Sequence, residues 1–158
     1  MKFSCKTGMV LFAALLAAPA FSAPKLINHY SQLVEALRQG DNVHAILELD
    51  KCKLATAVTP PDMTGAMTRM NFDVFSYYKV VMPNGKLQFA VATSSNLLVE
   101  HRQFGVVQGY ARLRVFEDDS AELHLAHFDP KTYEQKSDIN YLCQLNNGMK
   151  LYDDTDRS

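Results

Sequence analysis

The side chains best able to act as an acid, a base or a metal ligand near neutral pH are the five histidines of this 158-residue chain. His29, His44 and His101 have no partner for such chemistry close to them in the sequence. His124 and His127 are three positions apart in a segment with the alternation of a β-strand, so we expect them on opposite faces and not side by side as two ligands. The histidine pattern therefore predicts no metal site, and we expect no cofactor.

The hydroxyl and carboxyl groups of the chain form no catalytic or calcium-binding motif. Ser76, Ser94 and Ser95 lack the flanking Gly-x-Ser-x-Gly pattern that exposes a nucleophilic serine. The acidic run 117–119 lacks the alternating oxygen ligands and the closing glutamate of a calcium loop, and acidic residues are common in hairpin turns. An enzyme would therefore need a site assembled in space from distant residues.

Cys52 and Cys143 are the two cysteines that remain once the N-terminal segment described next is removed. They do not form a Cys-x-x-Cys redox pair, and the common zinc sites need four clustered ligands. In an exported chain we predict that they form a disulfide, with two buried free thiols as the alternative. In the chain-entropy account, closing a loop of this length contributes up to about 4.6 kcal/mol.

The first 22 residues have the three-part layout of a secretory signal peptide. Lys2 and Lys6 make a short basic start, residues 9–18 are an apolar run, and small residues follow. The run is too short to anchor the chain across a bilayer, so we expect cleavage after Ala20 or after Ser22. The predicted product is periplasmic or secreted and has no stable membrane anchor.

Charge and length limit the class of the remaining protein. Without Lys2 and Lys6, 14 basic residues stand against 17 acidic ones, a formal charge of −3. This is not the basic composition that a nucleic-acid-binding protein needs. Residues 23–158 have the length of one ordinary domain, and we expect a single β-rich unit.

A short helix and a strand are predicted at the start of this domain. Ser31 can cap the helix and Gly40 ends it. The apolar stripe of the helix consists of Leu33, Val34 and Leu37. In residues 43–49 the side chains at positions 43, 45, 47 and 49 are all apolar and alternate with the mostly polar ones at 44, 46 and 48. This period of two indicates a half-buried strand leading into Cys52.

A long strand is predicted from Met67 to Met82, because this segment is rich in aromatic and β-branched residues. Residues 83–85, Pro-Asn-Gly, then turn the chain into a returning strand over residues 86–93. A three-residue loop with a bulge pairs Val81 with Leu87, and we prefer it to a tight two-residue loop because proline has no amide hydrogen. Both faces of the first strand are apolar, so we expect it to be covered on both sides, with the N-terminal helix as one cover.

A second hairpin is predicted from Val107 to Phe116 and back from Ala121 to Phe128, with a three-residue loop at 118–120. The segment Ser94–Phe104 before it is less regular and reads as a loop or a short edge strand around residues 97–99. The predicted register places Val115 opposite Leu123, Leu113 opposite Leu125, and Arg114 opposite His124.

The chain ends with another alternating strand and a turn. The alternating apolar residues are Ile139, Tyr141, Cys143 and Leu145, and Asn147-Gly148 turns the chain into residues 149–152. We therefore expect a mainly β (α+β) fold: an antiparallel sheet, either open or closed into a small barrel, with a short N-terminal helix and one disulfide.

With these elements laid out, the chain resembles the VirK family of small exported bacterial proteins. The residues that carry the resemblance are structural landmarks: Leu33–Gly40, Val43–Leu49 with Cys52, Tyr110–Leu113, Asn140–Cys143 and Gly148. The resemblance covers essentially the whole domain and departs at Ser120, where we would expect the family to place glycine. It implies an exported, virulence-associated protein and supplies no catalytic residue, and the match of both cysteines supports the disulfide.

These observations predict a binding protein rather than an enzyme, with a protein partner or a small ligand. The side chains chosen as candidates for binding are Phe75, Tyr77, Tyr110, Arg114 and His124. Two alternatives stay open. One is a hydrolase in which His124, Arg114 or His101 meets a carboxylate, and the other is a carrier of apolar molecules whose cavity is lined by aromatic residues.

Overall fold

Within residues 23–55 and 64–155, the part of the chain that the computed structural model describes, the fold consists of ten β-strands, one α-helix and one 3-10 helix. The elements are β1 (Lys25–Ile27), α1 (Tyr30–Arg38), β2 (Val43–Glu48), η1 (Leu49–Lys51), β3 (Lys53–Leu54), β4 (Met67–Asn71), β5 (Phe75–Val81), β6 (Leu87–His101), β7 (Gly105–Phe116), β8 (Ser120–Phe128), β9 (Gln135–Leu145) and β10 (Gly148–Asp153). The predicted signal peptide, residues 1–22, lies outside the described residues.

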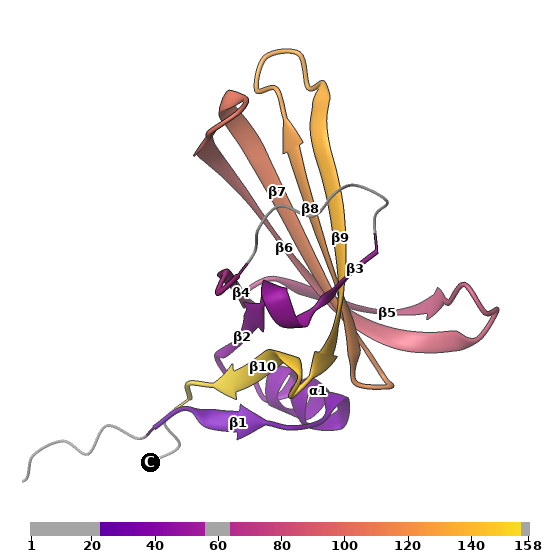
Figure 1. The fold of residues 1–158 in the computed structure, drawn as a ribbon. Helices are drawn as coiled ribbons and strands as arrows, with labels where there is room; N and C mark the ends of the chain where they lie inside the picture. The colour runs from indigo at the N-terminus through magenta and orange to yellow at the C-terminus, as the bar shows by residue number, and fades with distance from the viewer. Residues whose placement is uncertain (1–22, 56–63, 156–158) are drawn as a thin grey trace, which may run out of the picture.

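All ten strands belong to one sheet. Its order is β4-β2-β10-β9-β8-β7-β6-β5, with β1 added to β10 and β3 to β9. The strand pairs are antiparallel except for β9 and β10, which pair in parallel over two residues. Figure 1 shows β6 to β9 side by side along the molecule, with α1, β1, β2 and β10 gathered at one end. The predicted mainly β fold is confirmed, and the sheet is open because its path ends at β4 and β5.

The hydrophobic core lies where α1 packs on the sheet. Leu33 and Leu37, two residues of the predicted apolar stripe of α1, are buried in one cluster with the inward side chains of β2, β7, β8 and β10. Its largest fully buried members besides Leu33 are Leu47, Leu113, Leu123, Met149 and Leu151. Burying one such side chain contributes about 1.5–3 kcal/mol, so a nine-residue helix that is marginal alone is held by its contacts with the sheet.

The two ends of α1 are stabilised differently from one another. The predicted cap at Ser31 is wrong, because the helix begins at Tyr30 and its N-cap residue, His29, makes no side-chain capping bond. Instead, the Asp119 carboxylate accepts the Tyr30 amide hydrogen at 2.6 Å from a turn 89 residues further along the chain. Gly40 does end the helix as predicted, with φ +79° and its amide donating to the Leu37 carbonyl at 3.2 Å.

The predicted disulfide is confirmed. Cys52, at the end of η1, is bonded to Cys143 of β9 with an S–S distance of 2.05 Å and a Cα–Cα distance of 4.6 Å. Gly148 passes close to this bond with φ +89°, and a Cβ atom there would lie 3.0 Å from the Cys52 Sγ and 3.2 Å from the Lys51 carbonyl oxygen. The start of β10 therefore requires glycine next to the cross-link.

The single strand predicted from Met67 to Met82 is wrong. The segment forms two strands, β4 and β5, which lie at opposite ends of the strand order. The break between them is fixed by Phe72, which is buried in the core, and by Thr93. The Thr93 hydroxyl lies 2.8 Å from the Asn71 carbonyl oxygen and 2.9 Å from that of Val74, and its single hydrogen can be donated to either. Both halves have the local preferences of a strand, so only their tertiary partners reveal the break.

The prediction that both faces of this segment are covered is also wrong for β5. This strand is exposed along nearly its whole length, at the free end of the sheet. The end of α1 approaches it at one point, with the Arg38 guanidinium 5.7 Å from the centre of the Tyr77 ring. The preferred hairpin register is confirmed, since Val81 faces Leu87 across a three-residue loop closed by the Met82 amide and the Lys86 carbonyl at 2.8 Å.

Two further predictions in the middle of the chain are wrong. The segment Ser94–Phe104 is mostly part of β6, a 15-residue strand that pairs with β7 as far as His101. The hairpin of β7 and β8 exists, but its register differs by two residues, with Leu113 opposite Leu123 and Arg114 opposite Glu122. A shift of two residues leaves every side chain on its predicted face, so alternation cannot distinguish the two registers.

Candidate functional site

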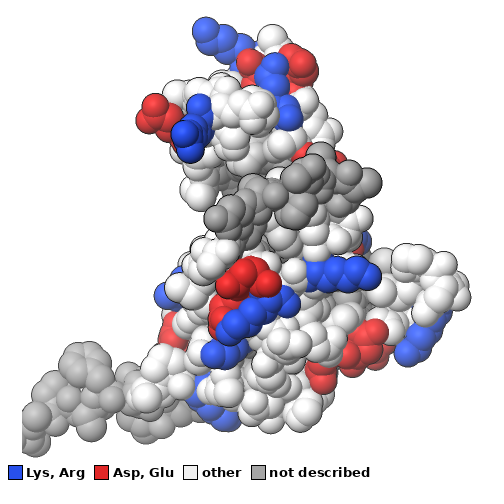
Figure 2. Space-filling model, viewed as in Figure 1, with Lys and Arg blue, Asp and Glu red and all other residues white. Residues whose placement is uncertain are grey.

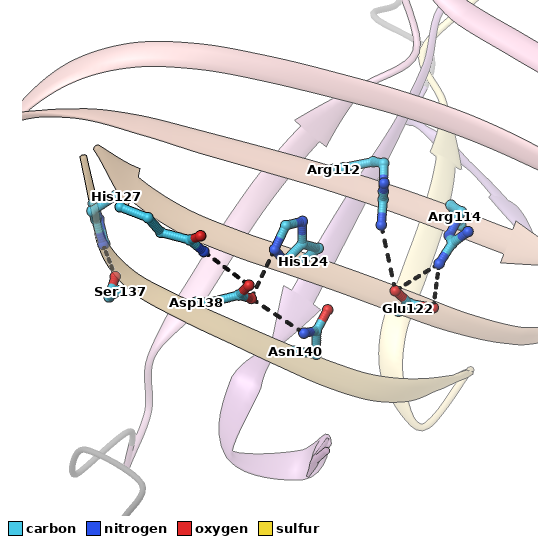
Figure 3. Close-up of polar contacts among 9 residues, drawn as sticks. Arg112, Arg114, Glu122, His124, His127, Ser137, Asp138 and Asn140 are labelled. Carbon is cyan, nitrogen blue, oxygen red and sulfur yellow. Dashed lines mark hydrogen bonds and ion pairs between the residues drawn. The ribbon is translucent and has the colours of Figure 1, made fainter. Parts of the chain in front are cut away.

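Strands β7, β8 and β9 separate an apolar face from a polar one. Their inward side chains belong to the core, whereas the opposite side, which we call the polar face, carries ionisable groups at successive outward positions (Figure 3). The residues of the polar face are Tyr110, Arg112, Arg114, Glu122, His124, Asp138 and Asn140. Alternation along three paired strands therefore brings together side chains that are up to 30 positions apart in the sequence.

The carboxylate of Glu122, on the polar face, lies close to two arginines. Arg114 Nη2 donates to both oxygens of Glu122, at 2.8 and 2.7 Å, whereas Arg112 Nη2 lies 3.6 Å from Glu122, beyond hydrogen-bond distance. Burial disfavours the charge of Arg114, but its hydrogen bonds with Glu122 and with Tyr78 outweigh this and raise the pKa of Arg114. The Nε atoms of Arg112 and Arg114 are buried and have no hydrogen-bond partner in the described part of the chain.

A histidine–carboxylate pair lies beside these arginines. His124 Nε2 is 2.8 Å from Asp138 Oδ1, and Asp138 also accepts hydrogen bonds from Asn140 at 3.3 Å and Gln135 at 2.9 Å. The Tyr110 ring meets the His124 ring edge-on, with 5.8 Å between centres. The other ring nitrogen of His124, Nδ1, is buried without a hydrogen-bond partner among the residues described.

The structure brings three of the five predicted binding residues together. Tyr110, Arg114 and His124 are neighbours on the polar face. Tyr77 is on the other side of the sheet, stacked on Phe89 with 5.0 Å between ring centres. Phe75, at the start of β5, is on the same side as Tyr77, at the rim of a depression of about 250 Å³ that Arg112 also lines.

Four members of the polar face were absent from the predicted binding residues: Arg112, Glu122, Asp138 and Asn140. The available signal was spacing, since Arg112 and Arg114 are two apart on one strand and so share a face, as do Glu122 and His124 on the next. In the predicted register Arg114 faces His124, which hides the contact between Arg114 and Glu122 that the structure contains.

The other histidines are dispersed. His127 lies on the opposite face of the sheet from His124. Its ring is 4.9 Å from that of His101, and its Nδ1 is 2.7 Å from the Ser137 hydroxyl. Burial and the neighbouring His101 lower the pKa of His127. Within residues 23–55 and 64–155 no three His, Cys, Asp or Glu side chains are grouped so as to hold a metal ion.

Comparison with known proteins identifies the family. The family described as VirK protein matches residues 26–133, which is more than half of the chain. The chain belongs to the VirK family. A similar protein is y4wH of Sinorhizobium fredii, described as uncharacterized, which is 26% identical over 144 residues, 90% of this chain and 91% of the relative.

A crystal structure of a VirK family protein from Legionella pneumophila has the same fold. The two structures superimpose with a TM-score of 0.60 at 15% sequence identity, over 80% of this chain and 97% of the Legionella chain. The Cys52–Cys143 disulfide is consistent with a location outside the cytoplasm. No helix in the described part of the chain is long and apolar enough to cross a bilayer.

Proposed function

We propose that this VirK family protein is an exported, virulence-associated binding module without enzymatic activity, and that its polar face binds a carboxylate of a partner or ligand. The observation that carries the proposal is that Arg114 and Arg112 contact Glu122 unequally. Arg114 takes both oxygens of this carboxylate, so Arg112 keeps a half-buried guanidinium with no hydrogen bond to it. A planar guanidinium binds a carboxylate through two parallel hydrogen bonds, which gives such a ligand both affinity and orientation.

The surface beside Arg112 supports this choice of ligand. The depression of about 250 Å³ that Arg112 lines is also lined by Ser76, Tyr78 and Ser94, which the strand registers place on the same face of the sheet as Arg112. The hydroxyls of these three side chains can donate further hydrogen bonds to an anion. The acidic side chain of a protein partner and a small free carboxylate have the chemistry that such a site recognises.

The hydrolase alternative is less well supported. His124 is paired with Asp138 as a catalytic base would be with the group that orients it. A nucleophile should then lie on the second ring nitrogen, but His124 Nδ1 is buried and none of the described residues is hydrogen-bonded to it. The same geometry is expected of a histidine that only orders the surface of a sheet.

The carrier alternative depends on a cavity lined by the aromatic side chains of residues 72–78, and it is less well supported because these side chains are dispersed. Phe72 is part of the core, and Phe75, Tyr77 and Tyr78 are exposed on the edge strand β5. Aromatic side chains at an open edge do not enclose a cavity for an apolar molecule.

Titration followed by NMR tests the proposal. Succinate and a short Asp-containing peptide are added separately to the protein, and the Arg112 side-chain Nε–H signal is followed. We expect this signal to shift, and the affinity to fall ~10-fold or more in Arg112→Gln, because a hydrogen bond to a charged group contributes ~1.5–3 kcal/mol. A preference for the peptide indicates a protein partner, and equal affinity indicates a small ligand.

Two variants serve as controls for this titration. Arg112→Lys keeps the charge but not the planar pair of donors, so an intermediate loss supports bidentate binding. Arg102→Gln removes an exposed arginine away from the polar face and should leave the affinity unchanged. If neither carboxylate shifts the Arg112 signal, or if Arg112→Gln binds as well as the parent protein, the proposal is wrong.

A further inference from the structure

The outer edge of β5 has no neighbouring strand in the described sheet. β5 is the last strand in the order, and its register with β6 runs without a bulge from Phe75 opposite Thr93 to Val81 opposite Leu87. Because the Met82 amide donates to the Lys86 carbonyl, alternation directs the backbone groups of even-numbered residues in β5 toward β6. The amides and carbonyls that point outward belong to Phe75, Tyr77, Lys79 and Val81.

This edge has little of the usual protection against pairing with another strand. Natural edge strands are kept short or carry proline, a bulge or charged side chains, lysine above all. β5 has seven residues, no proline, no bulge and one charged side chain, Lys79. Phe75, Tyr77 and Val81 are 41%, 42% and 67% exposed. A poorly protected apolar edge of this length is expected to be covered by another strand.

The edge is also accessible. β5 and the part of β6 that faces it form an arm, which we call the β5–β6 arm, projecting from the rest of the molecule in Figure 1. In Figure 2 most of the visible surface of this arm is uncharged. A strand can therefore approach β5 along its whole length.

The geometry points to a second copy of this chain as the occupant: β5 pairs with β5 of another molecule, antiparallel, about a two-fold axis at Tyr78. In this register Tyr77 faces Lys79 of the second copy and Phe75 faces Val81. These are pairs of outward-pointing residues, so every free amide and carbonyl of the edge gains a partner. A two-fold interface of this kind is self-complementary. The inference is independent of the proposed function.

Neighbouring registers are less favourable. Centring the axis on Lys79 would place two ammonium groups directly opposite each other, which is destabilising. Centring it on Tyr77 would place Val81 opposite Asp73, which lies outside the strand. A shift by one residue would set outward-pointing groups against inward-pointing ones. The register centred on Tyr78 is therefore the one that uses all seven residues of β5 without a clash of charge.

A consequence for the polar face follows from this symmetry. A two-fold axis perpendicular to a sheet keeps each face on its own side, so the two sheets become one and the two polar faces are continuous. Tyr78 lies on this side of β5, is hydrogen-bonded to Arg114 and would sit at the centre of the joined surface.

Disulfide trapping tests the register. Each variant of the purified protein carries one added cysteine, and Cys52 and Cys143 stay bonded to each other. Residues directly opposite in a non-hydrogen-bonded pair have Cα atoms about 4.5 Å apart, within the ~4.4–6.8 Å range of disulfides. Tyr78→Cys should therefore form a covalent dimer under mild oxidation. Non-reducing electrophoresis measures the dimer, and circular dichroism checks that each variant is folded.

Ser76→Cys and Val80→Cys are matched controls on the same face of the same strand. In the proposed register each lies about 14 Å from its own copy, because four residues of strand separate them. Alone, each should form ~10-fold less dimer than Tyr78→Cys, whereas an equal mixture of the two should cross-link to a heterodimer. If Tyr78→Cys dimerises no more than these single variants, or if the mixture does not cross-link, the register is wrong.

Sedimentation of the unmodified protein tests the dimer itself. We expect a concentration-dependent dimer that Lys79→Pro weakens, because proline removes an amide that points outward and that β6 does not use. Lys79→Ala keeps the amide and should retain the dimer. A protein that stays monomeric at all concentrations, or an equal effect of proline and alanine, would overturn the inference.

Discussion

Asp119 connects the turn between β7 and β8 to the first turn of α1. Its Oδ1 accepts the Tyr30 amide hydrogen at 2.6 Å, and its Oδ2 lies 3.2 Å from His29 Nδ1. The first amides of a helix have no partners within the helix, and its N-terminus favours a negative charge. The carboxylate therefore replaces the capping side chain that His29 does not provide. We predict that substitution of Asp119 destabilises the protein through α1.

Three contributions set the magnitude. A capping side chain contributes about 1 kcal/mol, and a charge at the helix N-terminus about 0.3–1 kcal/mol. Asp119 also has φ +62°, a left-handed conformation that costs a residue such as alanine about 1–2 kcal/mol but that asparagine tolerates. Asp119→Asn keeps an acceptor oxygen and should lose about 0.3–1 kcal/mol, whereas Asp119→Ala loses all three contributions and should lose about 2–4 kcal/mol.

Urea-induced unfolding measures these losses, and hydrogen exchange of the Tyr30 amide locates them. Exchange at Tyr30 should accelerate in Asp119→Ala and remain slow in Asp119→Asn. Asp119→Gly separates backbone strain from capping, because it should regain about 1 kcal/mol relative to alanine and still leave the Tyr30 amide unprotected. An Asp119→Ala protein as stable as the parent, with Tyr30 exchanging at the parent rate, would refute the reasoning.

Two further predictions concern the cross-link and the response to pH. Replacing both Cys52 and Cys143 by alanine removes a tie between residues 91 positions apart and should lower the free energy of unfolding by up to about 4.6 kcal/mol; an unchanged urea midpoint would contradict this. Because the pKa of His127 is lower in the folded protein, the unfolded chain binds more protons, and stability should fall as pH drops through the ordinary histidine range near ~6.5. His127→Gln should flatten this slope between pH ~5 and ~7, as measured by urea unfolding at each pH, and equal slopes would count against the assignment.

The features that could be predicted from the sequence depend on local chemistry or on covalent bonds. The loop at residues 83–85 has its register because proline lacks an amide and glycine adopts a positive φ, both of which are properties of the residues themselves. Gly40 ends α1 for a similar reason. The Cys52–Cys143 pairing followed from the presence of two cysteines in a chain that we expect to be exported.

The hairpin of β7 and β8 shows why other predictions failed. The left-handed residue of its turn is Asp119 and not a glycine, and its carboxylate is engaged with α1, which no local rule anticipates. The resulting register places Glu122 opposite Arg114, and the polar face depends on this contact. Spacing alone would have grouped Arg112 with Arg114, but not with the carboxylate that they share.

By itself, the sequence determined a β-rich chain with one N-terminal helix, one cross-link and two recognisable hairpins, because turn chemistry, alternation and covalent pairing act over a few residues or one bond. Only the tertiary structure decided that residues 67–81 divide into strands at opposite ends of the sheet, that β5 is left uncovered, and which charges meet on the polar face. The physical reason is that a strand's neighbours are chosen by contacts with residues far away in the chain, and a register shift of two residues is invisible to any pattern of alternation.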